Sequence, residues 1–288
     1  MKLAILTATK MPNMLPYDME VIALLEKRGV ETTILVWDKI ITDNPQELQK
    51  FDAILIRTIW DYYLKYDEYL KLLDILTASK VPVFNSVDVL KWNSNKKYLH
   101  ELQSEGFDII PTIFNINKSD NSFSKAILKG WDKIVLKPLI SGNSYHTFVI
   151  DIGDEVRFNQ LIKKHYVNSP YMLQEFIPEI SKGEISTISF SNGFSYSVTK
   201  VPPKGEYRVQ VDYGGIYHYG SVDPKINDIC TRITNRFEEK LLYQRVDGLW
   251  RNGKFLIMEV ELIEPDLYLN LNKDALNNWV DSLIDIIE

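Results

Sequence analysis

Residues 241–263 read LLYQRVDGLWRNGKFLIMEVELI, two apolar runs joined by the turn-forming segment RNG. In the second run Glu259 and Glu261 alternate with apolar residues, and side chains two positions apart project from the same face of a strand. Two carboxylates about 4 Å apart repel by roughly 1 kcal/mol in water and by about four times that in a protein cleft. A positive group must therefore compensate this acidic face.

The length of the turn decides whether Asp247 joins the two glutamates. A two-residue turn at 252–253 directs Asp247 away from Glu259. A three-residue turn at 251–253 pairs Asp247 with Ile257 and places it on the face of Glu259. An acidic cluster therefore requires the three-residue turn or another connection of the same parity.

Two kinds of cation satisfy this cluster. Asp247, Glu259 and Glu261 offer oxygen ligands only, which suits magnesium or manganese rather than zinc. The alternative is a salt-bridged hairpin that uses Arg245 or Arg251. The residue pattern leaves both interpretations open.

Composition limits the class of protein. The chain has 288 residues, a net charge of −6, four His and a single cysteine, Cys230. One cysteine rules out an internal disulfide framework, so we expect a cytosolic protein. The acidic balance argues against a nucleic-acid or membrane surface role, and one Cys with four scattered His does not suit a zinc site.

Strand and helix patterns alternate over the first 90 residues, which predicts a doubly wound parallel sheet. Asp18 is expected to cap a helix over 19–28, with Gly29 just after its end. A second helix is expected over about 66–79. The predicted strands are 2–8, 31–38, 51–58 and 81–86.

Ligands of such sheets bind beyond the carboxyl ends of the strands. The loops there predict a substrate pocket, with simple packing of the aromatic residues as the alternative. The candidate residues are Asp18, Arg57, Trp60, Asp61 and Tyr62. The first of these loops contains no glycine, which excludes a dinucleotide cradle of the GxGxxG type.

After a helix predicted within 94–107, closely spaced strands predict a largely antiparallel second half. We divide the chain into an α/β domain at 1–92, a small lid-like domain at 93–178, and an antiparallel α+β domain at 179–288. The segments SNG at 191–193 and RNG at 251–253 indicate hairpin turns. The predicted strands are 133–138, 146–151, 171–176, 184–191, 194–200, 206–214, 241–250 and 254–263.

A phosphate site is expected near residue 137. No GxxxxGK[ST] segment is present, but Lys137 ends a strand and precedes a loop of small residues. Such a loop grips phosphate through a charge and through backbone N–H groups. The loop residues are Ser141, Gly142, Asn143 and Ser144.

Polar residues downstream complete the pattern. Gln174 and Glu175 end an apolar strand, where they can bond a purine edge. Arg208 alternates with Glu206 and Gln210 along a predicted strand. Arg208 is either a structural ion pair or a guanidinium directed at a transferring phosphoryl group.

Six short segments occur in a fixed order along the chain: KP with its small loop, QEFIP, GE, RVQVDYGG, RVDG and MEVE. In this order they resemble the motifs of the ATP-grasp superfamily. They are most similar to the branch that contains bacterial glutathione synthetase and the ribosomal-protein glutamate ligases. GEYRVQ, YQRVDG and EVELIEPDLYL resemble the subgroup that forms cycloserine by closing O-ureidoserine.

The resemblance implies an ATP-grasp fold whose two α+β parts enclose ATP beneath a mobile loop at 141–146. It implies that Lys137 and either Lys96 or Lys97 bind phosphates, and that Glu184 binds ribose. Lys200 and Arg208 would stabilise the γ-phosphate and acylphosphate, and Asp247, Glu259 and Glu261 would hold one or two magnesium ions. The implied adenine hinge consists of Gln174, Glu175, Phe176 and Ile177.

The implied reaction is ATP-dependent ligation of a carboxylate to an amine through an acylphosphate, on an amino-acid or small peptide-like substrate, including intramolecular cyclisation. Glu261 departs from the pattern of many relatives, which have Asn there, and the added charge should tighten metal binding or alter the second metal site. The alternative function is ATP binding for regulation or phosphotransfer without ligation.

Substrate specificity is expected in the N-terminal loops and in the segment with Gly214 and Gly215. Many enzymes of this superfamily form homodimers.

Overall fold

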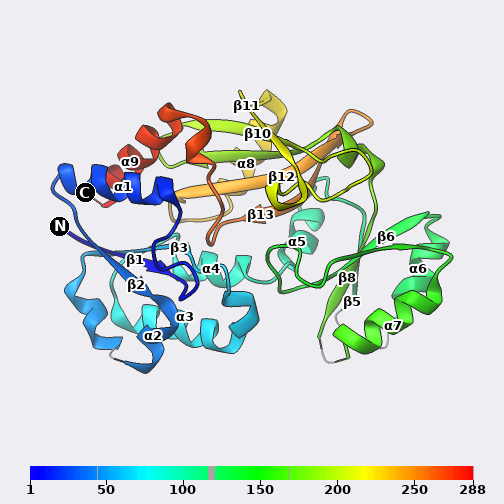
Figure 1. Cartoon of the computed structure of the whole chain (residues 1–288), viewed down its shortest axis with the longest axis horizontal. Helices are drawn as coiled ribbons and strands as arrows, with labels where there is room; N and C mark the ends of the chain where they lie inside the picture. Colours follow the sequence, from blue (N-terminus) through cyan, green and yellow to red (C-terminus); the bar gives the residue numbers. More distant parts are fainter. Residues whose placement is uncertain (44, 116–120, 168, 288) are drawn as a thin grey trace.

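The computed structural model describes residues 1–43, 45–115, 121–167 and 169–287, and three β-sheets follow one another along this chain (Figure 1). Each predicted domain contains one of the sheets, and the boundaries after residues 92 and 178 stay a prediction. None of the helices in these ranges has the length and apolar character needed to span a bilayer.

The first sheet is parallel, as predicted, with the strand order β2-β1-β3-β4. Its strands are β1 (Lys2–Thr7), β2 (Glu31–Val36), β3 (Ala53–Thr58) and β4 (Val83–Phe84). The helices of this part are α1 (Pro16–Lys27), α2 (Trp37–Thr42), α3 (Tyr66–Ser79) and the 3₁₀ turns η1 (Pro45–Lys50) and η2 (Tyr62–Lys65).

Helix α1 begins earlier than predicted. Its N-cap is Leu15 and Pro16 occupies the first turn, so the prediction of Asp18 as the N-cap residue is wrong. Asp18 lies at the third helical position, where its carboxylate accepts a hydrogen bond from the Leu15 N–H at 3.4 Å. Proline fits there because the first N–H groups of a helix have no partner within the helix. Gly29 follows the end of the helix with φ +86°, as predicted for a residue that stops a helix.

The middle sheet is antiparallel and has the order β5-β8-β6-β7. Two helices, α4 (Val87–Asn93) and α5 (Tyr98–Ser104), lead into it. The strands are β5 (Thr112–Asn115), β6 (Lys133–Pro138), β7 (Phe148–Asp151) and β8 (Tyr171–Glu175), and the helices are α6 (Ser122–Leu128) and α7 (Glu155–His165). Helices α6 and α7 pack against this sheet in one hydrophobic cluster.

The third sheet is antiparallel and has the order β11-β10-β9-β12-β13. Its strands are β9 (Glu184–Phe190), β10 (Ser195–Val201), β11 (Ile216–Gly220), β12 (Tyr243–Arg251) and β13 (Lys254–Glu261). The remaining helices are α8 (Pro224–Thr234), α9 (Lys273–Ile287), and the 3₁₀ turns η3 (Pro178–Lys182), η4 (Val211–Tyr213) and η5 (Leu269–Leu271).

The predicted strand at 206–214 is absent from the structure. The Glu206 carboxylate accepts hydrogen bonds from the backbone N–H groups of Tyr207 and Arg208. A side chain that binds its own neighbouring N–H groups competes with a strand ladder for them. The segment forms a loop with η4 instead, and the strand of this region is β11.

The turn between β12 and β13 has two residues, so the first of the two connections considered for an acidic cluster, a three-residue turn, is not the one present. Arg251 pairs with Lys254, and Asn252 and Gly253 have φ angles of 51° and 76°. Positive φ at both central residues is the geometry that an Asn-Gly turn favours between twisted strands.

A shift within the ladder restores the predicted parity. Gly248 pairs with Ile257 whereas Asp247 pairs with Glu259, so that Met258 is the extra residue of a β-bulge. Asp247 therefore lies directly opposite Glu259, as the acidic face requires. The alternation of the sequence indicated the face correctly, although a bulge and not the turn produces it.

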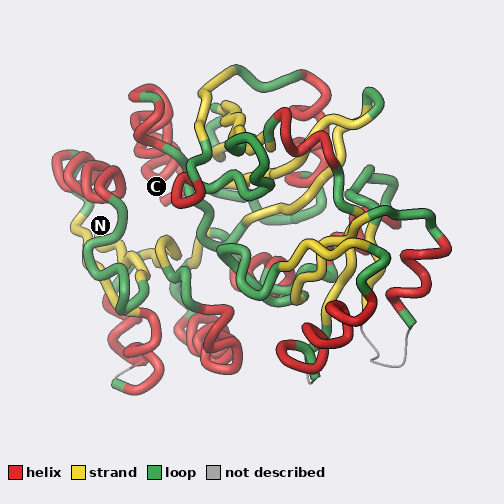
Figure 2. The backbone as a smooth tube through the Cα atoms, turned by 45° about the vertical axis from the view of Figure 1, so that its right-hand side comes forward, coloured by secondary structure: helices red, strands yellow, loops and turns green. Residues whose placement is uncertain are grey.

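The C-terminal helix α9 joins the first and third sheets. Trp279 and Leu283 of α9 share one hydrophobic cluster with Leu3, Leu25 and Tyr196. Both views place the chain ends on the same side of the molecule and the middle sheet at the opposite end (Figures 1 and 2). The packing of α9 brings the loop after β13 against the first sheet.

Candidate active site

A cavity of about 440 Å³ is lined by residues of all three parts of the chain. Most of the residues predicted from the sequence line it. They are Trp60, Tyr62, Lys96, Lys137, Ser141, Gly142, Asn143, Ser144, Gln174, Glu175, Phe176, Ile177, Glu184, Lys200, Arg208, Asp247, Glu259 and Glu261.

Three residues predicted for the substrate pocket are structural instead. The Arg57 guanidinium pairs with Asp18 at 2.9 Å, and both side chains are almost completely buried. Asp61 is buried and accepts a hydrogen bond from Trp37 Nε1 at 2.8 Å. None of the three lines the cavity, and each has its polar partner in the core instead.

Lys97, Gly214 and Gly215 also lie outside the cavity lining. Lys97 is exposed, so of the two lysines considered only Lys96 faces the site. A Cβ at Gly215 would lie 1.9 Å from the carbonyl oxygen of Val209, so this glycine allows a close backbone approach.

Lys137 lies in the cavity without an anionic partner. In the described part of the chain it forms no ion pair, whereas the neighbouring Lys96 binds Glu259 Oε1 at 2.6 Å. Loss of solvent, with a smaller effect of the Lys96 charge, lowers the pKa of Lys137 to about 8 against the opposing effect of Glu259. A cation held in this way favours an anion that enters the cavity.

Lys96 is buried and connects the loop after β6 to the acidic face. Its Nζ donates a hydrogen bond to the carbonyl oxygen of Ser141 at 2.8 Å and also pairs with Glu259. Lys96 and Lys137 together keep the pKa of Glu259 below its ordinary value although burial opposes this. The two lysines thus surround Glu259 with positive charge.

The predicted lid loop contacts both flanking parts. Asn143, Ser144 and His146 have φ angles of 49°, 55° and 49°, a region that non-glycine residues rarely adopt. Tyr145 packs on Tyr63 with ring centres 5.4 Å apart. On the other side, Gln210 Nε2 donates to Ser144 Oγ at 3.3 Å.

We expect the substitution Gly142→Ala to displace this loop and to slow ADP release several-fold without unfolding the protein. The new Cβ would lie 2.9 Å from two ring carbons of Tyr63, which is too close for both to keep their places. Steady-state kinetics and a thermal melt check this result. In the double variant with Tyr63→Ala, the ring is gone and the loss should be smaller; an equal loss would contradict the steric explanation.

Two residues of the predicted adenine hinge form side-chain contacts with neighbouring strands. Gln174 Nε2 donates to Thr112 Oγ1 at 3.1 Å, and Glu175 pairs with Arg251 Nη1 at 2.8 Å. Apolar side chains line the cavity nearby, as a flat aromatic ligand would require. They are Ile110, Val135, Phe176, Ile177, Ile180, Leu249 and Met258.

Lys200 is buried between two acids. It forms an ion pair with Glu184 and lies 3.9 Å from Asp247 Oδ1. Burial opposes its charge, yet Asp247 and Glu184 raise the pKa of Lys200 well above the ordinary value. The predicted ribose ligand Glu184 is therefore engaged by Lys200 in this structure.

Arg208 forms an ion pair with Glu206, as the first of the two interpretations of this residue predicted. Its Nη2 lies 2.6 Å from Glu206 Oε2, and the guanidinium lies 3.7 Å from the centre of the Tyr213 ring. The side chain also lines the cavity, so a catalytic role stays a prediction.

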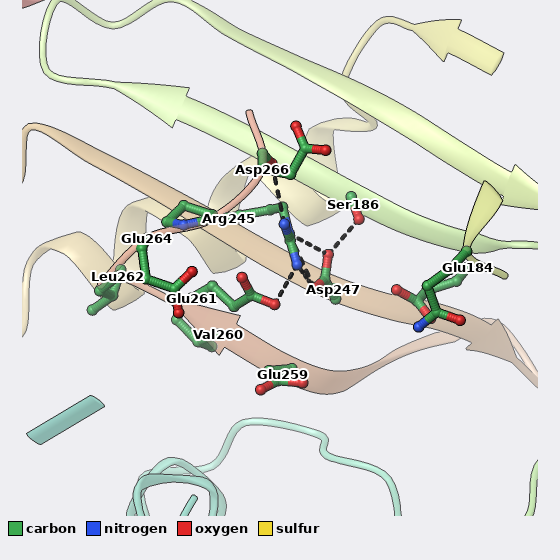
Figure 3. A network of polar contacts seen from close by, with 12 residues as sticks. Glu184, Ser186, Arg245, Asp247, Glu259, Val260, Glu261, Leu262, Glu264 and Asp266 are labelled. Atoms are coloured by element: carbon green, nitrogen blue, oxygen red, sulfur yellow. Dashed lines mark hydrogen bonds and ion pairs between the residues drawn. The ribbon is translucent and has the colours of Figure 1, made fainter. Parts of the chain in front are cut away.

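Arg245 holds the acidic face together (Figure 3). Its Nε donates to both oxygens of Asp247 at 3.1 Å, and its Nη2 reaches Asp247 Oδ2 at 2.9 Å and Glu261. Ser186 also donates to Asp247. Burial raises the pKa of Glu261 to about 7, against the opposing charge of Arg245, while Arg245 and Lys200 outweigh burial and keep the pKa of Asp247 low.

The acids suit a magnesium ion in chemistry but do not form a cage for one. In the described residues, no group of three or more Asp, Glu, His or Cys side chains is arranged to hold a metal ion. Arg245 binds Asp247 and Glu261, and Lys96 binds Glu259. The structure thus shows the salt-bridged hairpin through Arg245, while Arg251 pairs elsewhere; metal binding stays a prediction that requires these cations to release an acid.

Sequence reasoning missed several residues of the site. Arg245 was considered only as a structural cation, although it shares the strand face of Asp247 by simple alternation. Asn93 has no sequence signal: its side chain bonds the backbone of Val260 and Leu262 and thereby fixes β13. Tyr63 and Glu264 also line the cavity, and only the fold brings them there.

Two family models match the sequence. Residues 104–265, more than half of the chain, match the ATP-grasp domain of prokaryotic glutathione synthetase. Residues 3–85 match the N-terminal domain of the D-cycloserine synthetase DcsG.

Individual relatives agree with these models. The glutathione synthetase of Synechococcus elongatus is 25% identical over 236 residues, which cover 78% of this chain and 71% of the relative. The glutathione synthetase of Synechocystis is 22% identical over 209 residues, covering 72% of this chain and 63% of the relative.

Solved structures share the architecture. The crystal structure of DcsG has a TM-score of 0.84 at 18% identity and covers all of both chains. The D-alanine–D-alanine ligase from Bacillus anthracis complexed with ATP has a TM-score of 0.75 at 16% identity, covering 100% of this chain and 97% of that one. An ATP-grasp RimK domain protein from Sphaerobacter thermophilus has a TM-score of 0.70 at 15% identity, covering 99% and 100%. The predicted ATP-grasp fold is confirmed.

Proposed function

Since the chain belongs to the prokaryotic glutathione synthetase ATP-grasp family, whose members are ATP-dependent ligases that form carbon–nitrogen bonds, we propose that it joins a carboxylate to an amine through an acylphosphate. The observation that carries this proposal is the unpaired Lys137 in a cavity that also contains Lys96, Lys200 and Arg245. With Arg208, five cationic side chains of the described residues line this cavity, which suits a polyanion such as a triphosphate.

Different residues of the cavity suit different parts of ATP. The apolar residues near Gln174–Ile177 favour the adenine base, and Lys137 and Lys96 favour the phosphates. Lys200 and Arg245 lie beside Asp247, where they would stabilise negative charge on the transferring phosphoryl group. The loop at 141–146 would exclude water from the reactive intermediate.

The reaction balances without a covalent enzyme intermediate. A carboxylate oxygen of the substrate attacks the γ-phosphorus of ATP, and ADP leaves with the electrons of the broken P–O bond. The amine nitrogen then attacks the acyl carbon, phosphate departs with the carboxylate oxygen, and the nitrogen loses a proton. The protein contributes positioning and cations at the developing charge.

Magnesium is a proposed participant. Asp247, Glu259 and Glu261 would hold it, and when bound it neutralises charge on the phosphates. Because Arg245 and Lys96 occupy these acids in the structure, magnesium binding should compete with those ion pairs.

ADP release across a panel of amino acids and dipeptides, with ATP and magnesium, tests the proposed ligation. We expect ADP to appear only when both a suitable carboxylate and an amine are present, and Glu259→Gln to abolish it. Glu20→Gln, the same change at an exposed helix position, is the control and should leave turnover unchanged. ATP binding without turnover on any carboxylate would favour the regulatory alternative instead.

A further inference from the structure

The loop after β13 is held rigidly between the first and third sheets. Trp60 Nε1 donates to the carbonyl oxygen of Glu264 at 2.9 Å, and Arg57 Nη1 donates to that of Pro265 at 3.0 Å. Arg245 Nη1 donates to the carbonyl oxygen of Asp266 at 3.1 Å. Three consecutive carbonyl groups are thus fixed by Arg57 of β3, by Trp60 just after that strand, and by Arg245 of β12. Such support positions a side chain for binding.

Glu264 differs from the other glutamates of the cavity. Four of them have a cationic partner: Glu175 with Arg251, Glu184 with Lys200, Glu259 with Lys96 and Glu261 with Arg245. Glu264 also lines the cavity, yet within the described ranges its carboxylate has no ion pair and no hydrogen bond. Burial and the charge of Glu261 raise the pKa of Glu264 well above its ordinary value, against the opposing charge of Arg245. The ionised carboxylate therefore needs a cation from outside the chain beside it.

The surroundings of Glu264 define the kind of cation. Trp60, Tyr62 and Tyr63 line the same cavity, and aromatic rings attract an ammonium group through their faces. Figure 3 shows the Glu264 carboxylate directed toward Glu261, whose single cationic partner, Arg245, is shared with Asp247. This end of the cavity therefore has more acid than base.

Asp266 provides a contrast within the same loop. Its Oδ1 accepts hydrogen bonds from the Tyr17 hydroxyl and from the backbone N–H of Tyr268. These contacts hold the loop against α1, so the carboxylate of Asp266 has a structural role. Among the residues that the structure describes, the carboxylate of Glu264 has no such contact.

We propose that Glu264 receives the protonated amino group of the substrate and so restricts the enzyme to amino-acid-like carboxylates. The inference rests on the proposed function, because it names the substrate class of the same site. The bound ammonium is a recognition group at the phosphorylation step, since a protonated nitrogen has no lone pair with which to attack an acyl carbon.

Hydroxylamine trapping separates recognition from ligation. Hydroxylamine converts an acylphosphate to a hydroxamate, so the substrate's own amino group is not needed as the nucleophile. Free amino acids, each compared with its N-acetyl derivative, report the preference for an ammonium group. The variants are Glu264→Gln, the charge-retaining Glu264→Asp, and Glu20→Gln as a matched control.

We expect the wild-type protein to prefer free amino acids by about 30-fold or more in kcat/KM, the loss typical of removing one partner of a buried charge pair. Glu264→Gln should lose this preference through a higher KM for the amino acid, with the KM for ATP unchanged. Glu264→Asp should keep most of the preference for free amino acids, and Glu20→Gln should keep all of this preference.

Equal use of free and N-acetylated amino acids by the wild type would overturn the inference and leave the proposed ligase intact. A Glu264→Gln variant that changes only its ATP or magnesium dependence would also overturn it, since Glu264 would then act on the metal. Thermal melts of both Glu264 variants check the fold. If Glu264→Gln does not fold, the preference of Glu264→Asp for free over N-acetylated amino acids tests the inference instead. If no carboxylate yields ADP with the wild type, the proposed function itself fails.

Discussion

Replacing Arg245 by methionine is expected to lower the free energy of unfolding by about 3–5 kcal/mol and to abolish ATP-dependent ligation. The Arg245 guanidinium is buried and is the common partner of Asp247 and Glu261. Without it, two partly or fully buried acids lose their cation, and an uncompensated buried charge is costly. Urea denaturation measures the first effect, and ADP release measures the second.

A second substitution separates stability from catalysis. In the double variant with Asp247→Asn, the more deeply buried of the two acids is neutralised together with the loss of its cation, so much of the lost stability should return. Activity should not return, because Arg245 and Asp247 both belong to the proposed phosphoryl site. Full activity in the single Arg245→Met variant would show that Arg245 is only structural.

Replacing Lys137 by methionine is expected to weaken ATP binding by about 30-fold or more while the fold stays intact. Lys137 has no ion pair among the described residues, so its removal leaves no acid unpaired. Calorimetric titration with ATP measures the loss of affinity, and a thermal melt checks that the fold is intact. Lys133→Met, on the exposed part of the same strand, is the matched control and should bind ATP normally. Normal ATP affinity in Lys137→Met would contradict the assignment of the phosphates to this end of the cavity.

The lowered pKa of Lys137 adds a pH dependence to this prediction. With a pKa of about 8, Lys137 is charged at pH 7 and largely neutral at pH 9, so ATP affinity should fall about tenfold between these values. Lys137→Arg keeps its charge and should show little of this fall. For stability the sign is opposite: the charged lysine is unfavourable in the folded state, so this cost is present below pH 8 and disappears as pH rises toward the unfolded pKa of about 10.5.

The sequence predicted the sheets and most of the cavity because both depend on local alternation. The strand β6 and helix α3 have the predicted bounds, and the face shared by Glu259 and Glu261 follows from the period of a strand. The lysine before the small-residue loop also lies where a phosphate site was expected.

What the sequence did not reveal depends on contacts between distant segments. Asp18 and Arg57 are polar residues near strand ends, a position typical of a binding site, yet the fold pairs them with each other. The sequence left open whether Arg245, Arg251 or a metal ion neutralises the acids of the hairpin, and only the fold shows that Arg245 pairs with Asp247 and Glu261. Glu264 lines the cavity on a loop that three side chains distant in sequence fix, Arg57, Trp60 and Arg245.

Some missed elements had readable signals. Helix α8 begins with Pro224 at its first position, and the Asp223 side chain accepts a hydrogen bond from the N–H of Lys225. The pair Asp-Pro before an amphipathic run is a recognised start of a helix. Dense strand signals on either side obscured it. The absent strand at 206–214 was the converse error, since the sequence shows alternation but not the side-chain bonds of Glu206.

An isotope experiment tests the central claim of ligation through an acylphosphate most directly. A carboxylate substrate labelled with ¹⁸O is incubated with ATP, magnesium and an amine, and the released phosphate and the product are measured by mass spectrometry. The proposed mechanism predicts a C–N bonded product and phosphate that carries ¹⁸O from the carboxylate. Unlabelled phosphate, or ADP release without a C–N bonded product, would contradict it.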